Sequence, residues 1–249
     1  MSTRTEDWPK ATRPHRLVHV DEQLVVVDKP SHLLVHRTDL ALQDPDNLRE
    51  RLLAEGTIDH RWHPVNRIDR PTSGLVLFAR GGDAHRMLHE QFASHRAEKR
   101  YVAIVRGWLE APCTVDKPLP TSHNALPKDA STDFIPRAHF EWPVAITRYP
   151  TSRFSLVECR PSTGRYHQIR LHLRHLRHPI IGDSAHGDKP HNRFFAGHFT
   201  HRPLYLHAGH LALQHPDGTE RTWKSPLPED WQEVMETFGW GTETAFLRE

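Results

Sequence analysis

The chain of 249 residues lacks most of the features that mark secreted and membrane proteins. It contains only two cysteines, Cys113 and Cys159, which are too few for a disulfide framework. No apolar run approaches the roughly 20 residues that a membrane-spanning helix needs. Residues 1–14 are polar and contain no apolar stretch of the kind found in signal peptides. We therefore expect a cytoplasmic protein with no membrane contact, in which residues 1–14 form a flexible leader.

The sequence also has little net charge, +2 at pH 7, which by itself does not indicate nucleic-acid binding. The distribution of charge is more informative. Residues 160–202 hold eight Lys and Arg against two acids, whereas residues 217–249 hold eight acids against three bases. A basic segment beside an acidic tail is typical of a protein that meets phosphate on one side. The alternative is a genome that favours Arg, which outnumbers Lys 26 to 7.

Histidine is abundant, with 22 residues in all, eight of them within residues 167–201. Histidine is a common ligand of zinc and other transition metals, so a metal site in this segment is an alternative. However, the sequence contains neither an HExxH motif nor a Cys–His pairing at zinc spacing. We therefore expect no metal and no cofactor.

Hydrophobic periodicity and turn residues predict interspersed strands and helices without internal repeats. We expect strands at residues 16–20, 24–28, 74–79, 101–108, 144–148, 154–160, 204–214 and 221–223, and helices at 47–55, 83–95, 167–176 and 230–238. Residues 117–137 are rich in Pro, Ser, Thr and Asp and predict a loop. Hairpin turns such as 216–219 favour antiparallel pairing. We therefore expect an α+β fold with a mixed, mainly antiparallel sheet and flanking helices, in one catalytic domain over residues 15–249.

The predicted helix at residues 167–176 carries a basic pattern. Thr163 is a candidate N-cap residue, and Pro179 ends the helical segment. Arg170, Arg174 and Arg177 recur at helical spacing, opposite an apolar face. The pattern predicts a basic stripe that could contact phosphates, although an ordinary solvated helix face has the same pattern.

Residues 63–79 are the most informative stretch. Charged and turn-forming residues stand directly before a continuous apolar run, so Asp69 is expected at the edge of the core, between Arg67 and Arg70. A carboxylate held in this way is a candidate nucleophile or general base. On spacing alone, an aspartate that caps a turn is the commoner case.

Five ordered segments favour a catalytic Asp69 over a turn-capping one, because together they resemble the RluA-type pseudouridine synthases. Residues 66–75 (NRIDRPTSGL) are similar to the family's HRLDxxTSGL signature. The other four segments are 29–36, 99–107, 163–173, and 179–183 with 206–208, similar to KPxGLxVH, KxYxAxVxG, TGRxHQIRxHL, and PIxGD with LHA. The resemblance runs from about residue 18 to residue 216. Asn66 stands where the family has His, and Ser31 stands where the family usually has Gly.

Further segments resemble a branch of the family that modifies tRNA. They are residues 106–108, 147–151, 175–184, 186–188, 192–193 and 238–240. This resemblance implies that the partner is tRNA and that the target is a uridine of its acceptor/T-arm region, of the uridine-65 type. An rRNA-directed enzyme, a non-catalytic RNA-binding protein on the same fold and a His-rich metalloenzyme are the alternatives.

The family resemblance implies the pseudouridine synthase fold with a central catalytic cleft. Because the resemblance begins at about residue 18, we expect no separate N-terminal RNA-binding domain, and we expect the chain to act as a monomer. The resemblance implies that Asp69 acts on the ribose or base of a flipped uridine, by nucleophilic attack or by proton abstraction. Arg170 would keep Asp69 ionised, and Tyr101 would pack against the uracil. Arg67 would help to fill the space that the base leaves. The remaining residues expected to contact RNA or to support the site are Asn66, Arg70, Arg165, His167, Gln168, Ile169, Arg174, Arg177 and Lys189.

Overall fold

A computed structural model describes residues 10–11, 13–37, 46–120 and 126–241, so most of the expected leader, residues 1–9 and 12, lies outside the described residues. The chain divides into two compact units. Unit 1 comprises Met1–Ala97 and Leu211–Ser225, and unit 2 comprises Glu98–His210 and Pro226–Glu249. The expectation of one catalytic domain over 15–249 concerns function and stays a prediction.

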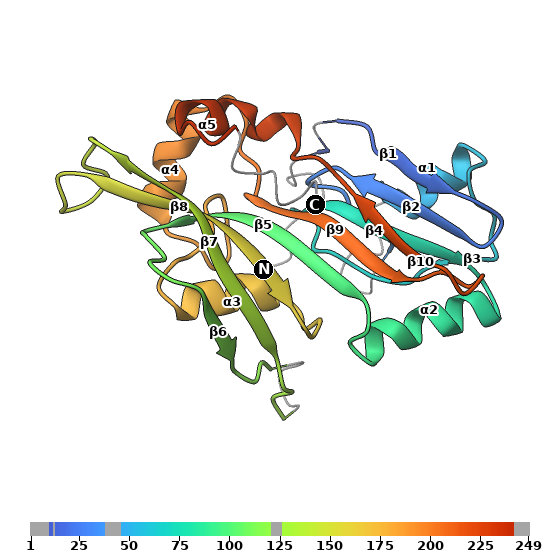
Figure 1. The fold of residues 1–249 in the computed structure, drawn as a ribbon. Helices are drawn as coiled ribbons and strands as arrows, with labels where there is room; N and C mark the ends of the chain where they lie inside the picture. Colours follow the sequence, from blue (N-terminus) through green and yellow to red (C-terminus); the bar gives the residue numbers. More distant parts are fainter. Residues whose placement is uncertain (1–9, 12, 38–45, 121–125, 242–249) are drawn as a thin grey trace. The chain divides into compact units, whose positions relative to one another are not determined.

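Unit 1 is built on an antiparallel arrangement of strands (Figure 1). The strand order is β1-β2-β4-β9, with β3 paired to β4 and β10 paired to β9. The bounds are β1 Arg16–Val20, β2 Leu24–Lys29, β3 Trp62–Pro64, β4 Ser73–Arg80, β9 Leu206–Gln214 and β10 Glu220–Lys224, of which β9 belongs to this unit from Leu211. The pairs β1–β2, β2–β4 and β3–β4 are all antiparallel, as the turn signals predicted.

The central strands of unit 1 are buried on both faces, which explains why their sequences are apolar without alternation. Side chains of β4 alternate between two clusters: Leu75 and Leu77 join one, while Val76 and Phe78 join the other. Helix α2, Asp83–Ala93, contributes Leu88 to the first cluster. Helix α1, Leu48–Ala54, contributes Leu48 and Leu52 to the second. Each face of β4 is therefore covered by a helix.

Unit 2 contains the second set of antiparallel strands and the remaining helices (Figure 1). The strand order is β9-β5-β8-β7-β6. The bounds are β5 Glu98–Arg106, β6 Cys113–Asp116, β7 Ser131–Trp142, β8 Ser152–Pro161, α3 Gln168–His175, α4 Lys189–His198, the 3-10 helix η3 Glu229–Trp231 and α5 Gln232–Thr237. The predicted α+β class with a mainly antiparallel sheet is confirmed.

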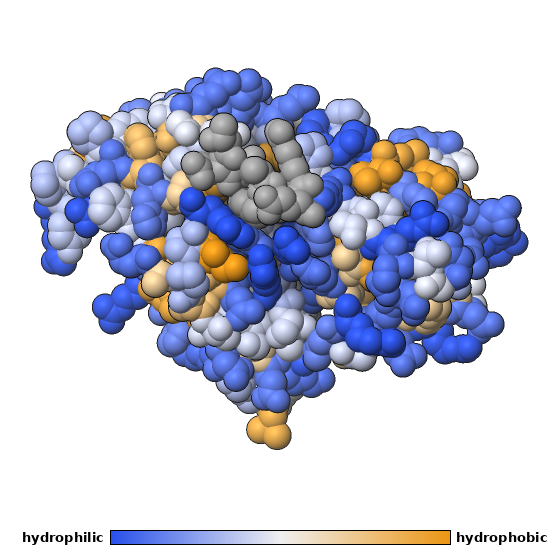
Figure 2. Space-filling model, in the orientation of Figure 1, coloured by the Kyte–Doolittle hydropathy of each residue, from blue (hydrophilic) through white to orange (hydrophobic). Residues whose placement is uncertain are grey.

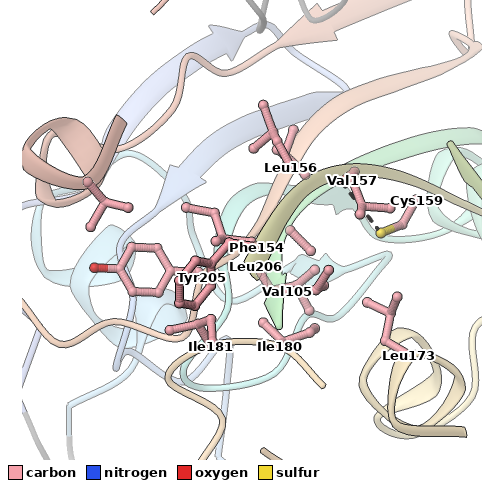
Figure 3. Close-up of a cluster of buried hydrophobic side chains, with 14 of the residues drawn as sticks. Val105, Phe154, Leu156, Val157, Cys159, Leu173, Ile180, Ile181, Tyr205 and Leu206 are labelled. Carbon is pink, nitrogen blue, oxygen red and sulfur yellow. Dashed lines mark hydrogen bonds between the residues drawn. The ribbon is translucent and has the colours of Figure 1, made fainter. Parts of the chain in front are cut away.

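The core of unit 2 forms where the strands meet the chain that follows α3. Phe154 and Leu156 of β8 are fully buried and pack with Ile180, Ile181 and Tyr205 (Figure 3). Backbone hydrogen bonds tie this segment to β5, because Ile181 N–H donates to Ile104 O at 2.9 Å. The chain after α3 is thus fixed to the sheet by packing and by hydrogen bonds.

Two strand and loop predictions in unit 2 were wrong. Residues 144–148 are not a strand, because Trp142 of β7 pairs with Ser152 of β8 and residues 143–151 connect the two. The predicted loop at 117–137 ends earlier than expected, since β7 begins at Ser131. Residues 121–125 of that loop lie outside the described residues.

One helix prediction also needs correction, and one helix was missed. The N-cap of α3 is His167, with φ 54°, and not Thr163. The Thr163 hydroxyl instead donates to Gln168 Oε1 at 2.6 Å. Helix α4 was not predicted, although its start carries a recognisable signal: the Asp188 side chain accepts from His191 N–H, and Pro190 occupies the first turn.

The visible surface is mainly hydrophilic, with small separate apolar patches (Figure 2). This agrees with the mean hydropathy of -0.67. Throughout the described ranges, the helices are too short or too polar to cross a lipid bilayer.

Candidate active site

Asp69 lies on a loop of unit 1 that connects β3 to β4, and Asn66 pins the first half of this loop. The ladder between β3 and β4 continues to Val65, whose N–H donates to Leu77 O at 2.8 Å. Beyond Val65, the Asn66 side chain makes the hydrogen bonds to β4 that backbone groups make in the ladder. Its Oδ1 accepts from Leu77 N–H at 2.7 Å, and its Nδ2 donates to Leu75 O at 3.3 Å. The main chain is therefore free to turn away from β4 while remaining attached to it.

A tight turn closes the second half of the loop. Thr72 N–H donates to Asp69 O at 3.0 Å, and β4 begins at the next residue, Ser73. The Asp69 side chain is half-buried. The sequence prediction that Asp69 stands at the edge of the core is confirmed, and the turn that was its alternative explanation is also present.

A buried lysine supports the loop that carries Asp69. Lys29, at the end of β2, is fully buried, and its Nζ donates to Pro30 O at 2.9 Å, Leu33 O at 2.8 Å and Arg70 O at 3.2 Å. Burial lowers the pKa of Lys29 to about 7, against the opposing attraction of the Asp69 and Asp28 carboxylates. Lys29 thus connects the core to the residue after Asp69 and places a titratable cation near the Asp69 carboxylate.

The two arginines that flank Asp69 have different surroundings. Arg70 is half-buried, and its Nε donates to His32 O at 3.3 Å, so it helps to hold the loop. Arg67 is exposed, and its guanidinium makes no hydrogen bond or ion pair within the described part of the chain. Arg67 is therefore available to an external partner.

Tyr101 and Arg170 belong to unit 2. Tyr101 lies on β5 opposite Cys159 of β8, is half-buried and packs against the core. Arg170 lies on the first turn of α3 and is only 4% exposed. A buried guanidinium needs a charged partner, because an isolated buried charge is costly.

Asp183 supplies that charge. Arg170 Nε donates to Asp183 Oδ2 and Arg170 Nη2 donates to Oδ1, both at 2.8 Å. The two side chains are 4% and 1% exposed, so this is a buried two-point ion pair. Burial raises the pKa of Asp183, but Arg170 and the N–H groups of His186 and Ala185 outweigh it and hold that pKa below its ordinary value.

The loop that carries Asp183 is held in place by its neighbours. Gly182 has φ +81°, and a Cβ there would lie 2.0 Å from Pro203 O, so only glycine fits. The Asn192 side chain accepts from Gly182 N–H at 2.8 Å and donates to Asp183 O at 2.9 Å. The carboxylate that orients Arg170 is therefore itself tightly positioned.

The start of α3 is braced by Gln168. Its Oε1 accepts from the Arg165 N–H and the Thr163 hydroxyl, and its Nε2 donates to Ser131 O and the Thr132 hydroxyl. With its amide fully occupied and its side chain buried, Gln168 has a structural role. Ile169 is also buried, in the core of unit 2.

The other expected RNA contacts in unit 2 vary in exposure. His167 is half-buried, and its Nδ1 lies 2.8 Å from His186 Nε2, while Arg165 Nε donates to Asp129 O at 3.0 Å. Arg174, Arg177 and Lys189 are exposed. The predicted stripe of three arginines on one helix face was wrong. Arg170 is buried, and Arg177 lies beyond the end of α3 with φ 64°.

A family model described as RNA pseudouridylate synthase matches residues 23–175, which include Asp69, Tyr101 and Arg170. The chain belongs to the RNA pseudouridylate synthase family. The resemblance noted in the sequence is thereby confirmed.

Named relatives within this pseudouridylate synthase family are similar over most of the chain. The tRNA pseudouridine synthase C of Vibrio cholerae is 39% identical over 235 residues, which cover 90% of this chain and 96% of the relative. That of Salmonella typhi is 41% identical and covers 90% of each chain. That of Pectobacterium carotovorum is also 41% identical, but the chain spans only 62% of its length.

Solved structures of pseudouridylate synthases share the fold. Human RNA Pseudouridylate Synthase Domain Containing 1 aligns with a TM-score of 0.67 and 20% identity, covering 93% of this chain and 97% of that one. Human RNA Pseudouridylate Synthase Domain Containing 4 aligns with a TM-score of 0.65 and 24% identity, covering 90% and 92%. The predicted pseudouridine synthase fold is therefore confirmed.

Sequence reasoning missed two residues of this pseudouridylate synthase that hold expected site residues in place: Lys29 supports the Asp69 loop within unit 1, and Asp183 pairs with Arg170 within unit 2. Asp183 and Lys29 both lie inside motifs that carried the resemblance, PIxGD and KPxGLxVH, but no role was assigned to either. The signal was a charged residue within an otherwise apolar or turn-forming motif. Burial of such a residue implies a specific partner, which only the folded chain identifies.

Proposed function

We propose that this chain isomerises uridine to pseudouridine in tRNA, with the Asp69 carboxylate as the group that acts on the target nucleotide. The observation that carries the proposal is the loop of residues 65–72. Asn66 and Lys29 hold this loop at a buried strand, and it presents a half-buried aspartate within the segment that matches the family signature. The names of the relatives support tRNA as the substrate.

The reaction breaks the glycosidic bond between ribose C1′ and uracil N1, turns the base, and joins C1′ to C5. The proton lost from C5 is balanced by the one gained at N1, so the reaction has no net redox change. Asp69 takes part either by attack on the sugar or by proton abstraction, and both roles require an ionised carboxylate. Lys29, when it is protonated, places a positive charge near this carboxylate.

The target base must leave its stack, which costs a few kcal/mol. Arg67, exposed and without a partner among the described side chains, is suited to occupy the vacated space with its planar guanidinium. Tyr101 contributes the aromatic face against which the uracil packs. Arg170 contributes a guanidinium whose direction is set by Asp183.

The phosphate backbone of the tRNA is bound by the exposed basic residues of unit 2. Arg174, Arg177 and Lys189 are the main candidates, because each is exposed and can reach an external phosphate. We also propose that the enzyme acts in the cytoplasm as a monomer. Its two cysteines, Cys113 and Cys159, are free, as they are in reducing compartments.

The decisive variant is Asp69→Asn, which preserves the shape of the side chain but removes its charge. Isomerisation of a tRNA transcript, followed by chemical mapping of pseudouridine, should fall by more than about 100-fold. Binding of the same transcript in a gel-shift assay should be retained. Asp59→Asn, at an exposed aspartate of the same unit, is the matched control and should remain active. An Asp69→Asn variant that keeps full activity would overturn the proposal.

The substrate is tested separately, by mapping pseudouridines in total tRNA and rRNA from a strain that lacks this gene. We expect the loss of one uridine modification in the acceptor/T-arm region of tRNA, of the uridine-65 type. If the missing site is in rRNA instead, the chain belongs to an rRNA-directed branch of the same family.

A further inference from the structure

A cluster of metal-ligating side chains lies in unit 1, outside the segment that carries Asp69. It consists of His19 on β1, Asp21 in the turn between β1 and β2, and His215 in the turn between β9 and β10. One ligand atom from each residue lies within 4.8 Å of the other two. His19 Nε2 lies 2.6 Å from Asp21 Oδ2, and His215 Nε2 lies 3.0 Å from the same oxygen.

We propose that His19, Asp21 and His215 form a binding site for a divalent transition-metal ion, with zinc as the best match. Zinc is bound by histidine nitrogen and carboxylate oxygen, and three protein ligands leave the fourth tetrahedral position to water. At zinc–ligand distances near 2 Å, the ligands of a tetrahedral site are separated by about 3.3 Å. The two imidazole–carboxylate separations, 2.6 and 3.0 Å, are slightly shorter than this value, so small side-chain rotations that widen the cluster complete the site.

The local backbone aims His19 at the cluster. The register between β1 and β2 shifts between Leu17 and His19, as it does at a β-bulge. A bulge places two residues opposite one and redirects a side chain. Val18 and His19 can therefore both reach the interior of unit 1, where Val18 packs against a core cluster and the His19 ring lies beside the Trp223 ring, with 5.7 Å between the ring centroids.

The carboxylate of Asp21 is positioned by its other oxygen. Asp21 Oδ1 accepts from Gln23 N–H at 2.8 Å and from Leu24 N–H at 2.9 Å. These bonds leave Oδ2 directed at both imidazoles. Asp21 is about one-third exposed, which gives an ion a path from solvent.

The third ligand, His215, has the supporting contact typical of metal-bound histidines. Its side chain is 6% exposed, and its Nδ1 lies 3.0 Å from Asp217 Oδ1. Nδ1 also accepts from Asp217 N–H at 3.1 Å. When Nε2 binds a metal, Nδ1 carries the proton, so this bond is exchanged for one that Nδ1 donates to the Asp217 carboxylate. A carboxylate behind the histidine fixes the ring and raises its basicity as a ligand.

The position of the site indicates a structural role. Unit 1 is made of two chain segments, Met1–Ala97 and Leu211–Ser225. His19 and Asp21 belong to the first segment, and His215 belongs to the second, so one ion would tie the two together. This role is independent of uridine isomerisation, for which no metal is proposed.

The test uses the full chain without a histidine tag, stripped with a chelator and titrated with zinc alone. We expect one zinc ion per chain by competition with a chromophoric chelator, together with a rise in Tm of several degrees when zinc is well above its Kd. His19→Ala and His215→Ala should each abolish the Tm rise. Asp217→Ala should weaken binding by about 10- to 100-fold.

Two controls keep the result interpretable. Asp21→Asn removes the anionic ligand but keeps an oxygen for the two N–H groups, so it should fold and still lose zinc. His60→Ala removes an exposed histidine of the same unit and should bind zinc like the unaltered chain. Failure of the unaltered chain to bind zinc, or undiminished binding by the His215→Ala and Asp21→Asn variants, would overturn the proposal.

Discussion

The Arg170 guanidinium and the Asp183 carboxylate meet in a buried, two-point ion pair, with both hydrogen bonds at 2.8 Å. Arg170 comes from the first turn of α3, and Asp183 comes from the chain that follows that helix. Asp183 thus sets the direction of the Arg170 guanidinium. The proposed function gives Arg170 a part in the reaction but gives none to Asp183. Asp183 is a positioning residue in this arrangement.

Replacing Asp183 with Asn should remove the Asp183 negative charge that pairs with the buried Arg170. We expect the free energy of unfolding to fall by about 3–5 kcal/mol, as measured by urea denaturation. Arg86→Ala is the control, because it removes an ion pair whose side chains are 78% and 90% exposed and should cost less than about 1 kcal/mol. Equal losses in the two variants would contradict the structural account of Arg170.

Lys29 should make the stability of the protein depend on pH. Burial lowers the pKa of Lys29 to about 7 in the folded chain, whereas an unfolded lysine has a pKa of about 10.4. Between these values the unfolded chain binds more protons, so the contribution of Lys29 to stability rises with pH. Below pH 7 both states are protonated, and the cost of burying the charge is fully present.

The corresponding variant is Lys29→Met, which keeps the length of the side chain and cannot titrate. The difference in unfolding free energy, unaltered chain minus variant, should increase by about 1–3 kcal/mol between pH 7 and pH 9. Urea denaturation at several pH values measures it. A constant difference over this range would show that Lys29 does not titrate there.

Asn66 should contribute to catalysis through the position of Asp69. Asn66→Ala leaves Leu77 N–H and Leu75 O without the side-chain partner, which should cost about 1–3 kcal/mol of stability. Because the loop then loses one attachment to β4, kcat should fall while KM for tRNA changes little. Asn66→Asp keeps the acceptor for Leu77 N–H but places an oxygen against Leu75 O, and should also lose activity. Unchanged kcat in both variants would remove Asn66 from the support of Asp69.

Arg174 should contribute to tRNA affinity through a phosphate contact. Arg174→Ala is expected to weaken binding and to reduce the slope of log K against log salt by somewhat less than 1, because one counterion fewer is released. Binding measured at several salt concentrations gives this slope. Arg86→Ala, an exposed arginine of unit 1 that already has an acidic partner, should leave it unchanged. A slope that Arg174→Ala does not alter would exclude this residue from the interface.

The amino-acid sequence by itself determined the elements that depend on local pattern. The apolar run at β4 predicted a buried strand, and the composition of residues 47–55 predicted helix α1. The sequence also determined the family and the place of Asp69 before a core strand. Both follow from short motifs that occur in a fixed order and specify the local turns and strands. The strand predicted at 144–148 failed because the pairing of Trp142 with Ser152 decides where that hairpin turns.

Only the tertiary structure decided which side chains meet. Helical spacing grouped Arg170 with the exposed Arg174, but the fold buried Arg170 and paired it with Asp183. The sequence drew attention to histidines in residues 167–201, whereas the candidate metal site joins Asp21 to His215, 194 positions away. Local patterns encode the periodicity of a helix or strand. They do not encode contacts between distant segments, because those depend on how the elements pack after they form.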